Sequence, residues 1–106
     1  METGNLLHTL PGALPAEISE CLVQSGGVKI ERIVSWGQHS DPGFWYDQAQ
    51  HEWVLLVKGA AILRFEQGDQ TVHLTPGAYL NIGAHERHRI DWTAPDQETV
   101  WLAVFY

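Results

Sequence analysis

Hydrophobic and polar residues alternate in short runs along most of the chain. The clearest run, residues 28–36, alternates β-branched with charged or polar residues and ends at Gly37. Many short strands at close, even spacing favour an antiparallel sandwich or barrel over alternating strand and helix units. Further strands are predicted at 44–47, 52–58, 60–66, 71–74, 79–82, 88–92 and 100–106, with turns at 67–69, 75–77 and 94–96.

The segment before the first strand has the pattern of a short helix. Pro15 suits a first helical position, Glu17 suits a first turn, and two glycines at 26 and 27 would end the helix. The buried face would hold Ile18, Cys21, Leu22 and Ser25. We therefore expect residues 1–27 to form an extension with one short helix from 14 to 27, and residues 28–106 to form an all-β domain.

Residues 53–57 are apolar at every position, although a strand with one wet face should alternate. Something must therefore cover the outer face of this strand. The N-terminal helix and strand are one candidate, and a second copy of the chain is the other. Five tryptophans in 106 residues suit an aromatic contact between subunits, so we expect a homodimer.

Composition and charge exclude several classes of partner. The chain is 44% hydrophobic and 18% charged, as in folded globular domains, and its formal net charge is −7. Nucleic acid and anionic membranes are not expected partners, because both require clustered Lys and Arg. Cys21 is the only cysteine, and no leader or membrane-spanning pattern is visible. We therefore expect a cytoplasmic protein.

Two segments resemble the conserved motifs of the cupins. The run E-W-V-L-L-V-K-G at 52–59 is similar to the second half of cupin motif 1, G-x5-H-x-H-x3or4-E-x6-G. The run P-G-A-Y-L-N-I-G-A-H-E-R-H at 76–88 resembles cupin motif 2, G-x5-P-x-G-x2-H-x3-N. The resemblance covers 28–106 and implies a small single-domain bacterial cupin, which is an antiparallel jelly-roll barrel.

The resemblance also implies a metal site, and the chain departs from it. Cupins that bind metal use two motif 1 histidines, the motif 1 glutamate and the motif 2 histidine, which would make Glu52 and His88 ligands here. The two motif 1 histidines are replaced by Trp45 and Asp47, or by Tyr46 and Gln48 at the shorter spacing, and His85 stands where glycine is usual. A divalent ion (Fe, Mn or Zn), if bound, would thus be held by Glu52, His88 and either Asp47 or His85, with water completing the coordination.

Three functions remain open at this point. In the first, the ion assists an enzyme acting on a small polar substrate, with Asp47 or His85 as general base. In the second, the metal site is lost, and Trp45, Tyr46, Tyr79 and Trp92 line a pocket that binds or senses a small organic ligand without catalysis. In the third, the exposed aromatic residues serve mainly to pair subunits. One ion requires Glu52 and His88 side-chain atoms within about 4.5 Å of each other.

Overall fold

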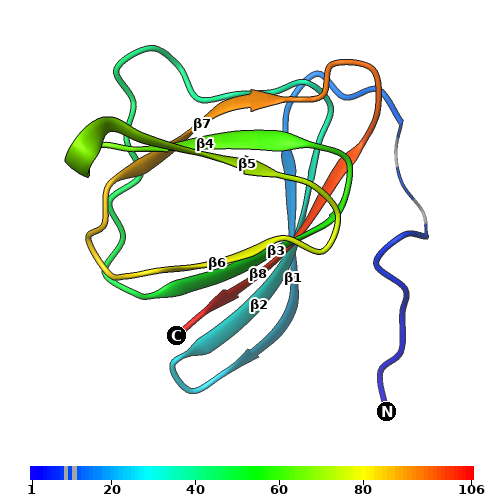
Figure 1. Ribbon diagram of the computed structural model, residues 1–106. Coiled ribbons are helices and arrows are strands. Elements are labelled where there is room, and N and C mark those ends of the chain that lie inside the picture. The colour runs from blue at the N-terminus through cyan, green and yellow to red at the C-terminus, as the bar shows by residue number, and fades with distance from the viewer. Residues whose placement is uncertain (9, 11) are drawn as a thin grey trace.

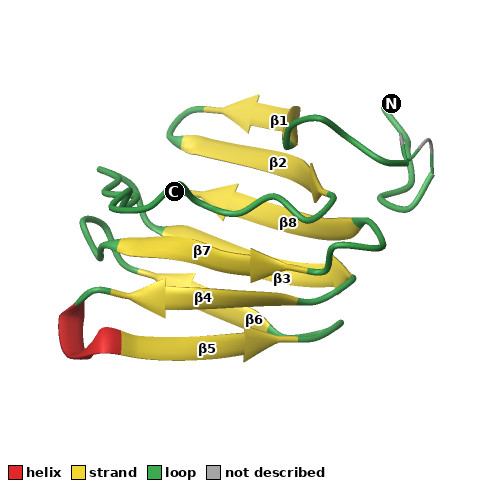
Figure 2. Ribbon diagram, turned by 90° about the horizontal axis from the view of Figure 1, so that it is seen from above, coloured by secondary structure: helices red, strands yellow, loops and turns green. Residues whose placement is uncertain are grey.

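Two antiparallel β-sheets face each other in the computed structural model, which describes residues 1–8, 10 and 12–106 (Figure 1). The strands are β1 (Ile18–Ser25), β2 (Val28–Ser35), β3 (Glu52–Lys58), β4 (Ala61–Phe65), β5 (Gln70–Leu74), β6 (Tyr79–Ile82), β7 (His88–Thr93) and β8 (Thr99–Phe105). One sheet has the order β1-β2-β8-β3-β6 and the other the order β5-β4-β7. Figure 2 shows the three-stranded sheet lying over the larger one.

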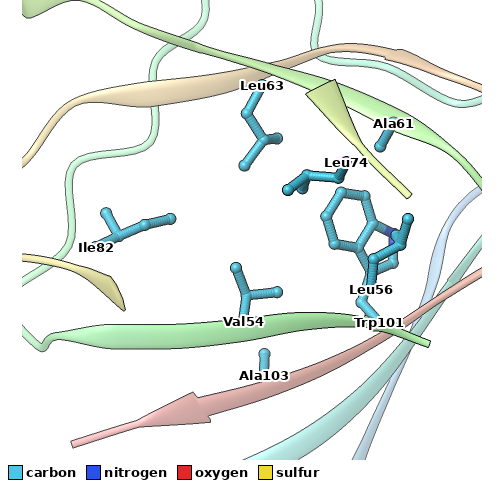
Figure 3. Close-up of a cluster of buried hydrophobic side chains, with 8 residues drawn as sticks. All are labelled: Val54, Leu56, Ala61, Leu63, Leu74, Ile82, Trp101 and Ala103. Carbon is cyan, nitrogen blue, oxygen red and sulfur yellow. The ribbon is translucent and has the colours of Figure 1, made fainter. Parts of the chain in front are cut away.

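Alternating side chains of both sheets form the hydrophobic core. Val54 and Leu56 of β3 point toward Leu63 of β4 and Leu74 of β5 (Figure 3). Leu56 has no exposed surface, and full burial of such a side chain contributes roughly 1.5–3 kcal/mol. The all-β prediction is therefore confirmed. Within the part of the chain that the structure describes, no β-ladder joins the two sheets, so the closed barrel stays a prediction.

The prediction of an N-terminal helix is wrong, because residues 18–25 form strand β1. This strand pairs antiparallel with β2 across the turn at Gly26-Gly27, with a bulge between Cys21 and Val23. The supposed buried face had no surface to pack on, since Ile18 is 36% and Leu22 is 38% exposed. Helix propensity is a weak preference, and pairing with the neighbouring strand prevails here.

The other strand predictions hold except for residues 44–47. That segment makes a single β-bridge, between Tyr46 and His88. The predicted turn at 67–69 is a short 3₁₀ turn in which Gly68 has φ 76°. Another glycine, Gly59, follows β3 with φ 94°, and an added Cβ would lie 2.4 Å from Thr99 Oγ1. This position therefore requires glycine.

The outer face of the five-stranded sheet is largely apolar. Facing residues of an antiparallel ladder share a side of the sheet, and Trp53 faces Val104 while Leu55 faces Leu102. These four side chains are half-buried. No helix among the described residues covers them, because the predicted helix is a strand of the same sheet. The N-terminal segment lies over the β2 part of this face, where Arg32 donates to the carbonyl oxygens of Leu6 and His8. Across the described ranges, no helix is long and apolar enough to cross a membrane.

Candidate functional site

A cavity of about 420 Å³ lies between the inner faces of the two sheets. Its size falls in the range of small-molecule sites, about 300–1,000 Å³. Apolar walls come from both sheets: Val54, Leu63, Ile82, Ile90, Trp101 and Phe105. The polar lining includes Glu17, Ser19, Lys29, Glu31, Gln48, Glu52 and His88. The cavity thus combines an apolar wall with a concentration of charged groups.

Glu52 and His88, the two inherited candidates, meet on the cavity wall. Each begins its strand, β3 and β7, and both are buried, with 9% and 5% of their surface exposed. The Glu52 Oε1 atom lies 3.7 Å from His88 Nε2, an ion-pair contact longer than a hydrogen bond. Gln48 Nε2 donates a hydrogen bond to the same Glu52 oxygen at 2.9 Å. The carboxylate and the imidazole are therefore held side by side.

The orientation of His88 is fixed by its neighbours. His88 Nδ1 lies 2.8 Å from the Glu86 carbonyl oxygen and donates to it, which leaves Nε2 directed at Glu52. The ring stacks on Tyr46 at 5.4 Å between centroids. Burial lowers the pKa of His88, but the Glu52 carboxylate and the Glu86 carbonyl together raise it more, so the pKa lies above 6.5. The imidazole therefore gains a proton more readily than a free histidine.

Asp47 and His85 are brought together, but not with Glu52 and His88. His85 Nδ1 lies 2.7 Å from Asp47 Oδ1, and both side chains are largely exposed, 68% for His85 and 46% for Asp47. Neither residue lines the cavity. His85 has φ 61°, an uncommon value for a residue with a side chain, and this turn directs its ring toward Asp47. The structure thus places the two predicted catalytic residues outside the cavity.

Of the four predicted pocket aromatics, Tyr46 lines the cavity and Trp45, Tyr79 and Trp92 lie elsewhere. Tyr79 belongs to the outer face of β6, where it is 64% exposed and stacks on Trp53. Trp92 faces outward because β7 has one extra residue, Asp91, opposite the Ile62–Leu63 step of β4. This bulge reverses the alternation that would have placed Trp92 beside Ile90.

Three charged residues of the cavity were not among the sequence candidates. Glu17, assigned to the helix, lies just before β1, and its Oε2 accepts a hydrogen bond from Ser35 Oγ at 3.0 Å. Burial raises the pKa of Glu17, the Ser35 hydroxyl lowers it, and the Glu52 charge raises it again; the net shift is upward. Lys29 and Glu31 alternate with apolar residues in β2. The sequence pattern therefore did not show whether their side chains point into the cavity or toward solvent.

The side chains present do not complete a metal centre. The Glu52–His88 distance allows both to bind one ion, but catalytic zinc sites use three protein ligands. Asp47 and His85 are engaged with each other outside the cavity. No group of three His, Cys, Asp or Glu side chains suited to a metal occurs among the residues placed by the structure. The described side chains of the cavity therefore supply two of the three protein ligands that such a site uses.

Comparison with known proteins identifies the family. The chain is 46% identical to a solved protein from Ralstonia eutropha JMP134 that carries the provisional name mannose-6-phosphate isomerase, with 99% of this chain and 97% of that chain covered and a TM-score of 0.96. A cupin superfamily protein from Desulfitobacterium hafniense DCB-2 has 23% identity over 86% of this chain and 77% of its own, with a TM-score of 0.71. The chain belongs to the cupin superfamily.

Other cupin structures share the fold alone. HppE, solved with cobalt(II) and Tris buffer, is 15% identical, with a TM-score of 0.72 over 89% of this cupin and 55% of the HppE chain. No family model matches this cupin. No curated protein matches it either. The geometry of the cavity is therefore the main basis for inferring a function.

Proposed function

We propose that this cupin binds a small organic molecule in the cavity, with Glu52 and His88 as the polar contacts. The observation that carries the proposal is the buried Glu52–His88 pair, 3.7 Å apart, on the wall of a 420 Å³ cavity with apolar sides. A pocket of this size with a few convergent polar groups is the usual form of a small-molecule site.

The pair offers the ligand two different functions. The Glu52 carboxylate accepts hydrogen bonds, and the His88 imidazole donates from Nε2 when protonated or accepts there when neutral. Because Glu52 and the Glu86 carbonyl raise the pKa of His88 despite its burial, the ring takes up a proton more readily than a free histidine. A bound molecule with an acidic or basic group would therefore meet a proton donor and a proton acceptor.

The metal-assisted enzyme is the second candidate, and the Glu52–His88 separation is the one observation that favours it. Two side chains and water would have to hold iron, manganese or zinc, which is fewer protein ligands than a catalytic zinc site uses. Such an ion would act as a Lewis acid on a bound oxygen. The absence of a third ligand among the described side chains makes organic binding the better supported function.

The test is a thermal-shift screen with two arms at pH 7. One arm contains neutral sugars, carboxylic acids, amino acids and amines; the other contains iron(II), manganese(II) and zinc(II) salts. We expect stabilisation by organic compounds, lost in Glu52→Gln and retained in Glu2→Gln, a change of equal charge at an exposed residue. Stabilisation by metals alone would establish the second candidate, and no stabilisation by any organic class would refute the proposal.

A further inference from the structure

The cavity has more acidic than basic groups. Glu17, Glu31 and Glu52 contribute three carboxylates, while Lys29 and His88 contribute the basic side chains. Lys29 Nζ lies 3.5 Å from Glu31 Oε2, so these two charges offset each other. Glu52 then has His88 as its basic neighbour, and Glu17 has only the Ser35 hydroxyl as a hydrogen-bond partner among the described residues. The lining therefore has one more carboxyl group than basic side chains.

One oxygen of the Glu52 carboxylate on the cavity wall has no donor in the described part of the protein. Glu52 is 9% exposed, and its Oε1 accepts the Gln48 hydrogen bond and faces His88. Its Oε2 accepts no hydrogen bond from any residue the structure describes. Among the described residues, no fully buried side-chain oxygen or nitrogen lacks a hydrogen-bond partner, so this oxygen is open to solvent. It is therefore available to accept a charge-assisted hydrogen bond from a ligand with a positive N–H group.

The walls suit a cation with an apolar body. The rings of Tyr46, Trp101 and Phe105 line the cavity, and aromatic faces attract cations. Lys29 Nζ already lies 5.2 Å from the Phe105 ring centroid, which shows a cation held in this way inside the site. The apolar side chains beside these rings provide surface for a hydrocarbon body.

We propose that the ligand is an organic amine, with a primary ammonium group near Glu52 and Glu17 and an aromatic or apolar body against the walls. This inference rests on the proposed function, because it specifies the ligand class of the same site. The same charges disfavour a phosphate dianion, since like charges repel most strongly where water is excluded. A sugar phosphate is therefore not expected to bind here.

The experiment uses three probes that share a phenyl body and differ in the charge of the head group. These are 2-phenylethylamine, 2-phenylethanol and 3-phenylpropanoate, with mannose 6-phosphate as a fourth probe, each titrated into ¹⁵N-labelled protein. Hydrogen bonds to charged groups contribute about 1.5–3 kcal/mol, so we expect the amine to bind at least about tenfold more tightly than the alcohol. The two anions should bind most weakly.

Glu52→Gln should reduce the advantage of the amine over the alcohol to about threefold or less, with alcohol binding nearly unchanged. Glu2→Gln should leave both unchanged. If Glu52→Gln does not fold, Glu17→Gln and Glu31→Gln test the same charge. Alcohol or carboxylate binding as tight as that of the amine would overturn the amine assignment and leave small-molecule binding intact. Failure of all four probes would also overturn the assignment, and a failed organic screen would overturn binding itself.

Discussion

The two faces of the five-stranded sheet distribute polar and apolar residues in an unusual way. In β2, Lys29 and Glu31 point into the cavity while Ile30 lies on the outer face, and in β3 Glu52 points inward while Trp53 points outward. A domain gains stability from the opposite arrangement, because buried charges are costly. The inward charges therefore support the proposed ligand site, whereas the outward side chains form a half-buried apolar face. Farther from Glu52, the inner face is an ordinary core, with Leu56 fully buried.

Two tryptophans, one on each face of the five-stranded sheet, should differ in their contribution to stability. Trp101 points inward and is 3% exposed, whereas Trp53 is half-buried on the outer face and stacks on Tyr79. Trp101→Ala should destabilise the fold by about 3–5 kcal/mol, because it leaves a cavity in the core. Trp53→Ala should cost the monomer about 1 kcal/mol. Urea unfolding at low protein concentration measures both, and equal losses would contradict the assignment of the two faces.

The inner face should also contain a residue that reduces stability. Burial and the Glu52 charge raise the pKa of Glu17 above 4.5, so the folded state binds its proton more tightly than the unfolded state. The stability from this proton is complete below pH 4.5 and is lost as the pH rises through the folded pKa. Glu17→Gln should therefore raise the melting temperature by a few degrees at pH 7 and have no effect near pH 3.

The test of Glu17→Gln is a pair of melting curves at each pH. The glutamine retains an acceptor for the Ser35 hydroxyl, so the hydrogen bond itself is not removed. A melting temperature at pH 7 below that of the wild type would show that the Glu17 carboxylate stabilises the fold. The interpretation that Glu17 serves ligand binding and lowers the stability of the fold would then be wrong.

His88 should give a pH dependence at higher pH. Its pKa lies above 6.5 in the folded protein, because Glu52 and the Glu86 carbonyl outweigh the effect of burial. The stability contributed by the protonated ring is complete below pH 6.5 and is lost as the pH rises through the folded pKa. The pKa of His88, followed by NMR, should fall in Glu52→Gln. An unchanged pKa would mean that the 3.7 Å contact has no electrostatic effect.

Much of the fold was predictable from alternation. The segments that became β2 to β8 were located within one or two residues, because apolar and polar positions alternate between clear turn residues. β1 was missed because 18–25 is mostly exposed, so its pattern does not depend on one buried face. Backbone pairing with β2 decides its structure, and single-sequence patterns do not report which strand lies beside which.

The site was predictable only where family motifs fixed it. Glu52 and His88 were named from their motif positions, and the structure brings them together. The sequence did not indicate that Glu17 lines the cavity, because the direction of its side chain depends on the pairing of β1 with β2. Trp92 was assigned inward by alternation, and a bulge at Asp91 turned it outward. A bulge adds one residue to one strand, and a pattern of period two does not reveal where that occurs.

The smallest expected effect concerns the exposed pair of Asp47 and His85. Both side chains are wet, and an exposed ion pair contributes about 0.2–1 kcal/mol at most sites. Asp47→Asn should therefore change the free energy of unfolding by less than about 0.5 kcal/mol, because asparagine retains a hydrogen bond to His85. Affinity for 2-phenylethylamine should stay within about twofold of the wild type, since Asp47 does not line the cavity. A loss of affinity comparable to that of Glu52→Gln would place Asp47 in the binding site and join the two carboxylate–imidazole pairs into one functional unit.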